Sequence, residues 1–225
     1  MRVAKAVREL AKSSVPKTAR ELAKSVMPDA IISKARRFLY PPPGVHWCRV
    51  VMNRECDAFV DTHNVSGLTC LEISPVESRW AQRKWARYTA VDYPDYDVCS
   101  KPLPGAWDVI IAEQVLEHVR DPQRALDNIF NMLRSGGFTL ITTPFLIKFH
   151  PYPYDFCRWT ADGMREALRR SGFSSVVVNS WGNRECVIAD MTDDNAWTFY
   201  VPSRHSLRNN PRFPVCVWAF GHKEN

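Results

Sequence analysis

Residues 107–122 read WDVIIAEQVLEHVRDP, and residues 123–144 continue as QRALDNIFNMLRSGGFTLITTP. The apolar run Val109-Ile110-Ile111 ends at the polar pair Glu113-Gln114, which is typical of a buried parallel strand. Asp121 and Pro122 then suit the N-cap and first position of a helix. Because open α/β sheets bind ligands at the carboxyl ends of their strands, the segment predicts a strand whose polar end borders a ligand site.

Length and composition favour one α/β domain with a modest extension. The chain has 225 residues, of which 45% are hydrophobic, enough for a sizeable core. It has no run of about 18 apolar residues and no apolar signal segment at its start, so we expect a soluble, cytoplasmic protein without a transmembrane helix. The seven cysteines are scattered without a C-x-x-C pair, which favours reduced thiols over disulfides or structural zinc.

The positive charge is concentrated at the beginning of the chain. The formal net charge is +6, and residues 1–40 hold ten Lys and Arg residues against three Asp and Glu residues. The rest of the chain is therefore close to neutral. A protein that grips a nucleic acid backbone should carry its charge on the main fold, so we expect no nucleic acid partner.

Residues 1–43 are predicted to form a basic helical arm. The sequence RELAKSSVP at residues 8–16 recurs as RELAKSVMP at residues 20–28, and each copy has amphipathic helical spacing and ends at a proline. A third short helix is expected at about residues 28–39, before the proline run at residues 41–43. The arm could pack on the domain with solvated basic faces, or act as a lid or peripheral membrane contact. Its glutamates disfavour a mitochondrial presequence.

Residues 44–225 alternate predicted strands and helices after an indistinct helical stretch near residues 50–60. This alternation predicts a doubly wound, mostly parallel sheet of seven strands whose last strand is antiparallel. The predicted strands are 67–73, 88–91, 96–99, 107–112, 138–143, 174–178 and 214–220. The predicted helices are 76–85, a helix from Asp121 closed by Gly136-Gly137, and one from Thr160 to Ser171-Gly172.

Two segments carry a family resemblance. Leu71-Glu72-Ile73 and the stretch around Leu116-Glu117-His118 resemble class I S-adenosylmethionine-dependent methyltransferases of the type 11-like group, which have a Rossmann-like fold. The resemblance covers roughly residues 67–220 and implies S-adenosylmethionine as cofactor. It also implies cofactor roles for five side chains: Glu72 at the end of the first strand, Asp92 at the ribose, Asp97 at the adenine, and Glu113 and Gln114 at the methionine end. Asp92 stands 20 residues beyond Glu72, a suitable separation for a carboxylate at the neighbouring strand end.

The expected glycine-rich turn is degenerate. It reads Ser74-Pro75-Val76-Glu77-Ser78, without glycine, although the backbone there should approach the cofactor closely. Pro75 also lacks a backbone donor. Either a modified turn holds the cofactor, with the Ser74 hydroxyl replacing a backbone contact, or cofactor binding has been lost.

A loop rich in aromatic residues follows the predicted fifth strand. The run from Pro144 through His150 to Thr160 resembles a motif in methyltransferases associated with glycan or secondary-metabolite pathways. His150 is the candidate general base toward an acceptor hydroxyl, although a structural role fits it equally well. The candidate acceptor-binding residues are Tyr152, Tyr154, Arg158 and Asn183. Asp155 and Arg158 are expected to pair with each other, and His118 is expected to hold its turn.

The resemblance implies methyl transfer from S-adenosylmethionine to an oxygen, or as second choice a nitrogen, of a small-molecule acceptor such as a sugar or secondary metabolite. No clustered ligand set is apparent in the sequence, so no metal is expected. A nicotinamide-dependent oxidoreductase is disfavoured because G-x-G-x-x-G is missing. A non-catalytic binding module would explain the missing glycines, because fold does not imply function. The sequence leaves the oligomeric state open.

Overall fold

The computed structural model describes residues 44–75, 79–192 and 197–224. The predicted basic arm at residues 1–43 lies outside these residues. Among the described residues, the structure contains no helix that is both long and apolar enough to cross a membrane.

The core is a mixed sheet in the order β2-β1-β3-β4-β6-β5. Strands β1 to β4 are mutually parallel, and β6 runs antiparallel to both β4 and β5, which confirms the predicted mostly parallel sheet with an antiparallel last strand. The six strands of the described region are β1 (Thr69–Ile73), β2 (Arg87–Val91), β3 (Trp107–Glu113), β4 (Leu133–Pro144), β5 (Ser175–Trp181) and β6 (Cys216–His222).

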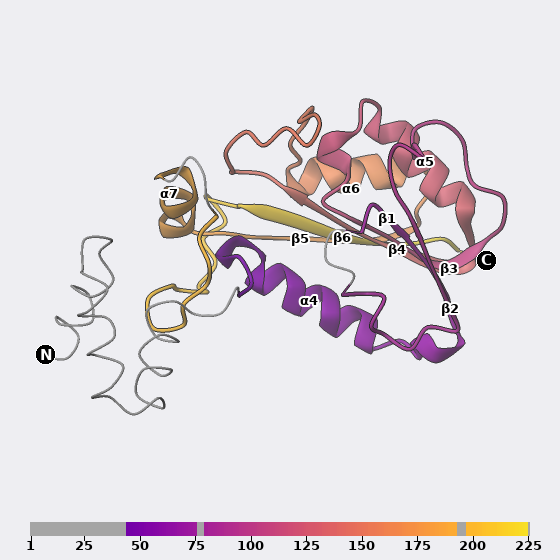
Figure 1. Ribbon diagram of the computed structural model, residues 1–225, viewed down its shortest axis with the longest axis horizontal. Coiled ribbons are helices and arrows are strands. Elements are labelled where there is room, and N and C mark those ends of the chain that lie inside the picture. Colours follow the sequence, from indigo (N-terminus) through magenta and orange to yellow (C-terminus); the bar gives the residue numbers. More distant parts are fainter. Residues whose placement is uncertain (1–43, 76–78, 193–196, 225) are drawn as a thin grey trace, which may run out of the picture. The chain divides into compact units, whose positions relative to one another are not determined.

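Helices cover both faces of this sheet, with α4 on one side and α5 and α6 on the other (Figure 1). The bounds of the α-helices are α4 (Val50–Asp61), α5 (Pro122–Met132), α6 (Ala161–Arg170) and α7 (Arg184–Thr192). Short 3-10 turns are η1 (Trp47–Arg49), η2 (Val65–Gly67) and η3 (Leu116–His118).

The middle of β3, from Val109 to Ala112, is apolar because both of its faces are buried. Val109 and Ile111 belong to the apolar cluster on the α4 side, whereas Ile110 and Ala112 belong to the cluster on the α5 and α6 side. Side chains alternate between the faces of a strand, so a doubly covered strand needs an uninterrupted apolar run. Burial on both faces therefore explains the apolar run Val109-Ile110-Ile111.

Two helix starts agree with the predicted caps. The Asp121 side chain accepts a hydrogen bond from the Arg124 backbone N–H at 3.0 Å, and Pro122 follows at the first position of α5. The Thr160 hydroxyl accepts from the Gly163 backbone N–H at 3.0 Å at the start of α6. The predicted end of α5 is wrong: the helix ends at Met132, and the Gly136-Gly137 pair lies within β4.

The predicted strand at residues 96–99 is also wrong, which leaves six strands rather than seven in the described chain. The backbone turns there, since Tyr96 N–H donates to the Asp92 carbonyl at 2.9 Å and the Asp97 carboxylate accepts from Cys99 N–H at 2.8 Å. Such a side-chain bond competes with sheet pairing.

Two helix predictions need correction as well. The described part of the predicted helix at 76–85 forms turns, and α7 was not predicted at all.

Candidate active site

The carboxyl ends of β1, β2 and β3 meet at one edge of the sheet. Ile73 is level with Val91 of β2 and with Ala112 of β3. The following residues, Ser74 and Asp92, therefore emerge side by side at this edge, with Gln114 after β3. Ser74 and Gln114 both have left-handed backbone conformations, with φ of 51° and 57°. The predicted cofactor positions at these three strand ends are thus brought to one edge.

Glu72, the next-to-last residue of β1, is buried and bonded to β2. Its side chain is 2% exposed and accepts a hydrogen bond from the Tyr88 hydroxyl. Burial raises the pKa of Glu72, while the bond from Tyr88 acts in the opposite direction. Through the bond from Tyr88, this carboxylate joins β1 to β2. Its contact with the cofactor stays a prediction.

Glu113 binds two residues that follow β1 in the chain, Arg79 and Trp80. Its Oε2 accepts a hydrogen bond from Trp80 Nε1 at 2.8 Å and from Arg79 Nε at 3.2 Å. Arg79 also pairs with Asp57 at 3.1 Å and stacks over the Trp80 ring at 4.1 Å. The Trp80 indole is completely buried, so the chain after β1 folds back and is fixed at the end of β3. Glu113 therefore holds Arg79 and Trp80 at the end of β3. Its role at the cofactor stays a prediction.

Asp92 and Asp97 are exposed beyond the edge strand β2. Asp92 Oδ1 accepts from the Tyr93 backbone N–H at 2.9 Å, and its second oxygen accepts no hydrogen bond from the described residues. It remains suited to binding a pair of ribose hydroxyls. Asp97 is used in the turn described above, although its side chain still faces solvent.

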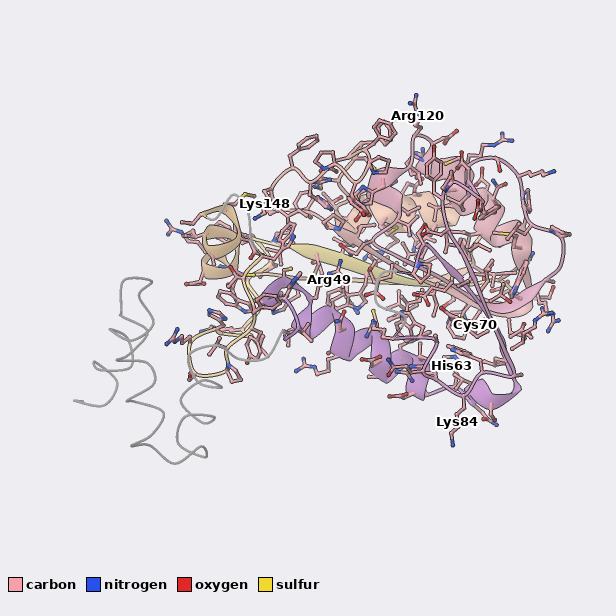
Figure 2. The ribbon with its side chains drawn as sticks, viewed as in Figure 1. Arg49, His63, Cys70, Lys84, Arg120 and Lys148 are labelled. Carbon is pink, nitrogen blue, oxygen red and sulfur yellow. The ribbon has the colours of Figure 1, made fainter. Side chains whose placement is uncertain are left out.

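A cavity of about 240 Å³ lies beyond the ends of β3 and β4. Gln114 and Pro144 border it from these strands, and Gln114 Nε2 donates to Thr142 Oγ1 at 3.0 Å, which holds the amide at the wall. Figure 2 shows Arg49 where α4 begins. The other lining residues come from η1 and the residue before it, from the loop after β4, from Trp197, and from the start of β6 and the residue before it. They are His46, Cys48, Arg49, Ile147, His150, Trp197, Val215 and Cys216.

His150 is the predicted base, and the structure places it at this cavity. Its Nδ1 lies 3.4 Å from Asp155 Oδ2, and its ring stands edge-on to Trp197 with centroids 5.8 Å apart. Burial lowers the pKa of His150, which outweighs the opposite influence of Asp155. The imidazole is therefore neutral near neutral pH and able to accept a proton.

An ion pair braces the loop that carries His150. Arg158 binds Asp155 with both of its terminal nitrogens, which confirms the predicted pairing. Burial alone would raise the pKa of Asp155, but hydrogen bonds from Arg158 and from the His150 backbone lower it to about 2. Arg158 also lines a second, open cavity of about 370 Å³ together with Phe149 and Phe156. Its guanidinium is engaged in ordering the loop.

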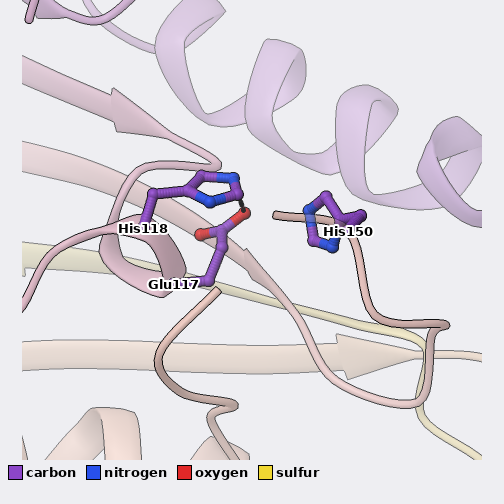
Figure 3. Close-up of side chains that lie close together, drawn as sticks. All are labelled: Glu117, His118 and His150. Atoms are coloured by element: carbon purple, nitrogen blue, oxygen red, sulfur yellow. Dashed lines mark ion pairs between the residues drawn. The ribbon is translucent and has the colours of Figure 1, made fainter. Parts of the chain in front are cut away.

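Glu117 and His118 lie beside His150 and extend the site (Figure 3). Glu117 is completely buried, neither of its carboxylate oxygens has a hydrogen-bond partner among the described residues, and burial raises its pKa to about 8. His118 Nδ1 donates to the Tyr154 carbonyl at 2.5 Å, and its Nε2 lies 3.6 Å from Glu117 Oε1. His118 therefore holds the loop after β4 rather than only its own turn.

The remaining predicted acceptor residues differ in exposure. Tyr152 and Tyr154 are 86% and 48% exposed, so their rings stand outside the cavity. Asn183 is buried, with Oδ1 accepting from Cys186 N–H at 2.8 Å and Nδ2 donating to the Ser206 carbonyl at 3.0 Å. Asn183 therefore caps α7, and the Nδ2 amide also donates to the Arg208 carbonyl at 3.3 Å. Its contact with an acceptor molecule stays a prediction.

Sequence reasoning missed several residues of the site. Arg49 and Trp197 reach the cavity through backbone pairing between distant segments, as Trp47 N–H donates to the Thr198 carbonyl at 2.8 Å. Nothing local in the sequence signals that contact. Glu117 could have been suspected, since an acidic side chain next to a histidine directly follows a predicted strand end.

Residues 46–178, more than half of the chain, match a methyltransferase-domain family. The chain belongs to this family, and the sequence-based identification as a class I methyltransferase is confirmed. Its sheet of parallel strands with an antiparallel last strand, flanked by helices on both faces, is the Rossmann-like fold of that class.

Two curated mycobacterial proteins are similar over part of the chain. A probable S-adenosylmethionine-dependent methyltransferase of Mycolicibacterium smegmatis is 35% identical over 39% of this chain and 37% of its own length. A probable methyltransferase of the same kind from Mycobacterium tuberculosis is 30% identical over 41% of this chain and 36% of its own length. The chain thus spans less than two fifths of the length of these relatives.

Solved structures share the fold at low sequence identity. An S-adenosylmethionine-dependent methyltransferase from Mesorhizobium loti has a TM-score of 0.52 at 16% identity, covering 75% of this chain and 97% of the other. A Thermotoga maritima methyltransferase described as a possible histamine N-methyltransferase has a TM-score of 0.51 at 16% identity, covering 87% and 97%. At sequence identities this low, the structural similarity shows a shared fold alone.

Proposed function

We propose that this protein transfers a methyl group from S-adenosylmethionine to an oxygen, or as second choice a nitrogen, of a small polar acceptor such as a sugar or secondary metabolite. The observation that carries the proposal is the juxtaposition of two features at one sheet edge. Ser74, Asp92 and Gln114 offer polar groups at three neighbouring strand ends, and the cavity that holds His150 begins at Gln114. A cofactor on the strand ends would direct its methyl group toward that cavity.

Asp92 would bind the ribose hydroxyls, and the Ser74 hydroxyl would replace a backbone contact of the missing glycine turn. Asp97 would lie toward the adenine. His150 would accept the proton of the acceptor hydroxyl as its oxygen attacks the methyl carbon. Methyl transfer otherwise needs mainly alignment of nucleophile, carbon and sulfur, which a walled cavity provides.

Calorimetric titration with S-adenosylhomocysteine tests the cofactor part. Asp92→Ala should weaken binding about tenfold or more, because a carboxylate that accepts two hydroxyl hydrogen bonds contributes about 1.5–3 kcal/mol. Asp95→Ala removes a carboxylate from the same exposed turn and should leave affinity unchanged. Folded wild-type protein without binding heat at millimolar ligand would refute the proposal.

A binding module without catalysis is the second candidate, supported by Glu72 and Glu113. Both carboxylates are already taken by protein donors, Tyr88 for the first and Trp80 with Arg79 for the second. Binding of S-adenosylhomocysteine by the wild type, lost in Asp92→Ala, favours the enzyme. Absence of binding favours the module.

We further propose that residues 1–43 are a separate basic arm that contacts anionic surfaces. Their charge differs from that of the nearly neutral remainder of the chain, and this contrast supports a role apart from cofactor binding.

A further inference from the structure

Three potential metal ligands lie close together, and one of them, His150, lines the cavity. Glu117, His118 and His150 each offer one ligand atom, and these atoms lie within 4.8 Å of one another. Glu117 and His118 belong to η3, whereas His150 comes from the loop after β4, so the fold alone brings the third ligand to the other two (Figure 3). Ligands at about 2.0–2.2 Å from one ion lie closer together than this, and small side-chain rotations would close the gap.

The geometry points to a divalent-cation site formed by Glu117, His118 and His150. Three side chains supply one carboxylate and two imidazoles, a set that suits borderline ions such as Co²⁺, Mn²⁺, Fe²⁺ or Zn²⁺ better than Mg²⁺ or Ca²⁺. The inference contrasts with the expectation from sequence, where only the adjacent Glu117-His118 pair is visible.

The carboxylate of Glu117 is the strongest argument for a bound cation. The side chain is completely buried, and neither oxygen has a hydrogen-bond partner among the described residues. A buried, unpaired carboxylate is costly, and buried charges in proteins are paired or coordinate metals. Arg49 and Arg158 affect Glu117 electrostatically, but neither forms a hydrogen bond with it in the described structure. A cation would satisfy both oxygens.

The orientation of His118 supports the same inference. Because a carbonyl only accepts, the bond to Tyr154 requires a proton on Nδ1, which leaves Nε2 of the neutral ring as a lone pair. That nitrogen lies 3.6 Å from Glu117 Oε1. Two acceptors that face each other need a proton or a cation between them. Metal-bound histidines commonly donate their other N–H to a backbone carbonyl, as His118 does.

His150 completes the set from the cavity side. Its ring lies 5.0 Å from that of His118, nearly perpendicular to it, and its Nδ1 lacks a hydrogen-bond partner among the described residues. Three protein ligands leave at least one open position on the ion. Because His150 lines the cavity, an acceptor oxygen there could reach that position, and a pair of adjacent oxygens could occupy two.

The role of such an ion in catalysis rests on the proposed function, methyl transfer to an acceptor. With an ion bound, His150 is a ligand instead of the direct proton acceptor. The acceptor hydroxyl would bind the ion, lose its proton to solvent, and attack the methyl carbon of S-adenosylmethionine. The new O–CH₃ bond forms as the S–CH₃ bond breaks, and its electron pair remains on sulfur in S-adenosylhomocysteine. An ion that lowers the pKa of the bound hydroxyl is an established means of producing such a nucleophile.

Direct binding of Co²⁺ and Mn²⁺ to the chelator-treated full chain tests the site. Equilibrium dialysis should give one ion per chain, Mg²⁺ should compete poorly, and Co²⁺ should raise the melting temperature with concentration. Glu117→Gln and His150→Gln should each weaken binding at least tenfold. His63→Gln, a histidine against Phe138 and outside the cluster, should leave it unchanged. Glu117→Gln keeps the size and shape of the side chain without its titratable group and should remain folded, so it can be assayed even if His150→Gln cannot.

Three results would overturn the site: no binding at millimolar Co²⁺ by folded protein, binding that both variants retain, or an intense thiolate-to-cobalt absorption band that identifies cysteine ligands. Titration with S-adenosylhomocysteine in parallel separates this inference from the proposed function. Cofactor binding without Co²⁺ binding refutes the metal site alone, whereas Co²⁺ binding without cofactor binding refutes the proposed function alone.

Discussion

Ser74 and Gln114 share a left-handed backbone conformation at the ends of neighbouring parallel strands, with φ of 51° and 57°. They are the two non-glycine residues with positive φ in the described chain. Such conformations cost about 1–3 kcal/mol and concentrate at functional sites. At Ser74, where a glycine was expected, the backbone has the left-handed conformation that glycine adopts without strain.

Two substitutions of Ser74 distinguish the effect of the backbone turn on cofactor binding from the effect of the serine hydroxyl. Ser74→Ala and Ser74→Gly both lack the hydroxyl, and we expect each to weaken S-adenosylhomocysteine binding about fivefold, as the loss of one hydrogen bond implies. Only glycine relieves the strained backbone, so Ser74→Gly should be the more stable of the two in thermal unfolding. A glycine variant that binds as tightly as the wild type would show that the backbone, not the hydroxyl, holds the ligand.

The features that could be predicted from sequence are those encoded locally. The run Val109-Ile110-Ile111 indicated β3 because a doubly buried strand has no polar side chain to interrupt it. Asp121 and Thr160 indicated helix starts because a cap needs only residues within its own first turn. The acidic residue at position 92 could likewise be placed at a strand end by spacing alone.

The errors arose where distant contacts outweigh local preference. Residues 79–83 form turns, although they were part of the predicted helix, because Trp80 is buried against Glu113 from another strand. Asp97 turns the chain where a strand was expected. In the site, Glu117 gains its importance only through burial and through the approach of His150, neither of which is visible in the sequence.

The Trp80–Glu113 hydrogen bond should stabilise the fold. Trp80→Phe removes the only donor that the indole contributes and leaves a buried carboxylate with Arg79 alone, at a cost of about 1–3 kcal/mol beyond the lost volume. Trp218→Phe is the matched control, because its buried Nε1 has no partner among the described residues and the change removes volume only. In urea unfolding, Trp80→Phe should lower the free energy of unfolding more than Trp218→Phe does. Equal decreases would contradict the stabilising role of the Trp80–Glu113 hydrogen bond.

Asp108 should contribute pH-dependent stability by linking β1 to β3. Its Oδ2 accepts hydrogen bonds from the Thr69 N–H and hydroxyl, both at 2.7 Å, and Arg134 pairs with it at 2.9 Å. Burial would raise the pKa of Asp108, but these bonds outweigh it and lower the pKa.

Because the folded pKa of Asp108 lies below the unfolded value of about 3.9, its contribution is complete above that pH and is lost as the pH falls through the folded pKa. Asp108→Asn should lower the free energy of unfolding by about 1–3 kcal/mol at pH 7, and the difference from wild type should shrink below about pH 4. Asp162→Asn, in an exposed pair with Arg165, should have an effect within about 0.5 kcal/mol. A pH-independent difference would exclude the ionised carboxylate as its cause.

A chain that begins at Gly44 should retain its affinity for S-adenosylhomocysteine and lose salt-sensitive binding to anionic lipid vesicles. The arm carries the excess positive charge, and screening weakens such attraction at high ionic strength. Vesicle sedimentation of both chains, with neutral vesicles as control, measures the second effect. A shortened chain that is folded but cannot bind the ligand would show that the arm belongs to the site.

Substitution of His150 should separate chemistry from cofactor binding. His150→Ala should lower turnover about 100-fold or more, since a positioned imidazole contributes about that factor as a general base, and should leave S-adenosylhomocysteine affinity nearly unchanged. The readout is S-adenosylhomocysteine release with an acceptor found by screening, and His63→Ala is the control. Near-native turnover would leave alignment or Asp155 as the source of catalysis.

Glu117→Gln then decides how His150 acts. If the imidazole accepts the proton directly, Glu117→Gln should keep most of the activity, because Glu117 does not line the cavity. If the three side chains act through an ion, Glu117→Gln should lose activity to a similar degree as His150→Ala, and prior removal of metal with a chelator should reproduce the loss in the wild type. Restoration by added Co²⁺ or Mn²⁺ in the wild type but not in Glu117→Gln would establish the ion as the group that activates the acceptor.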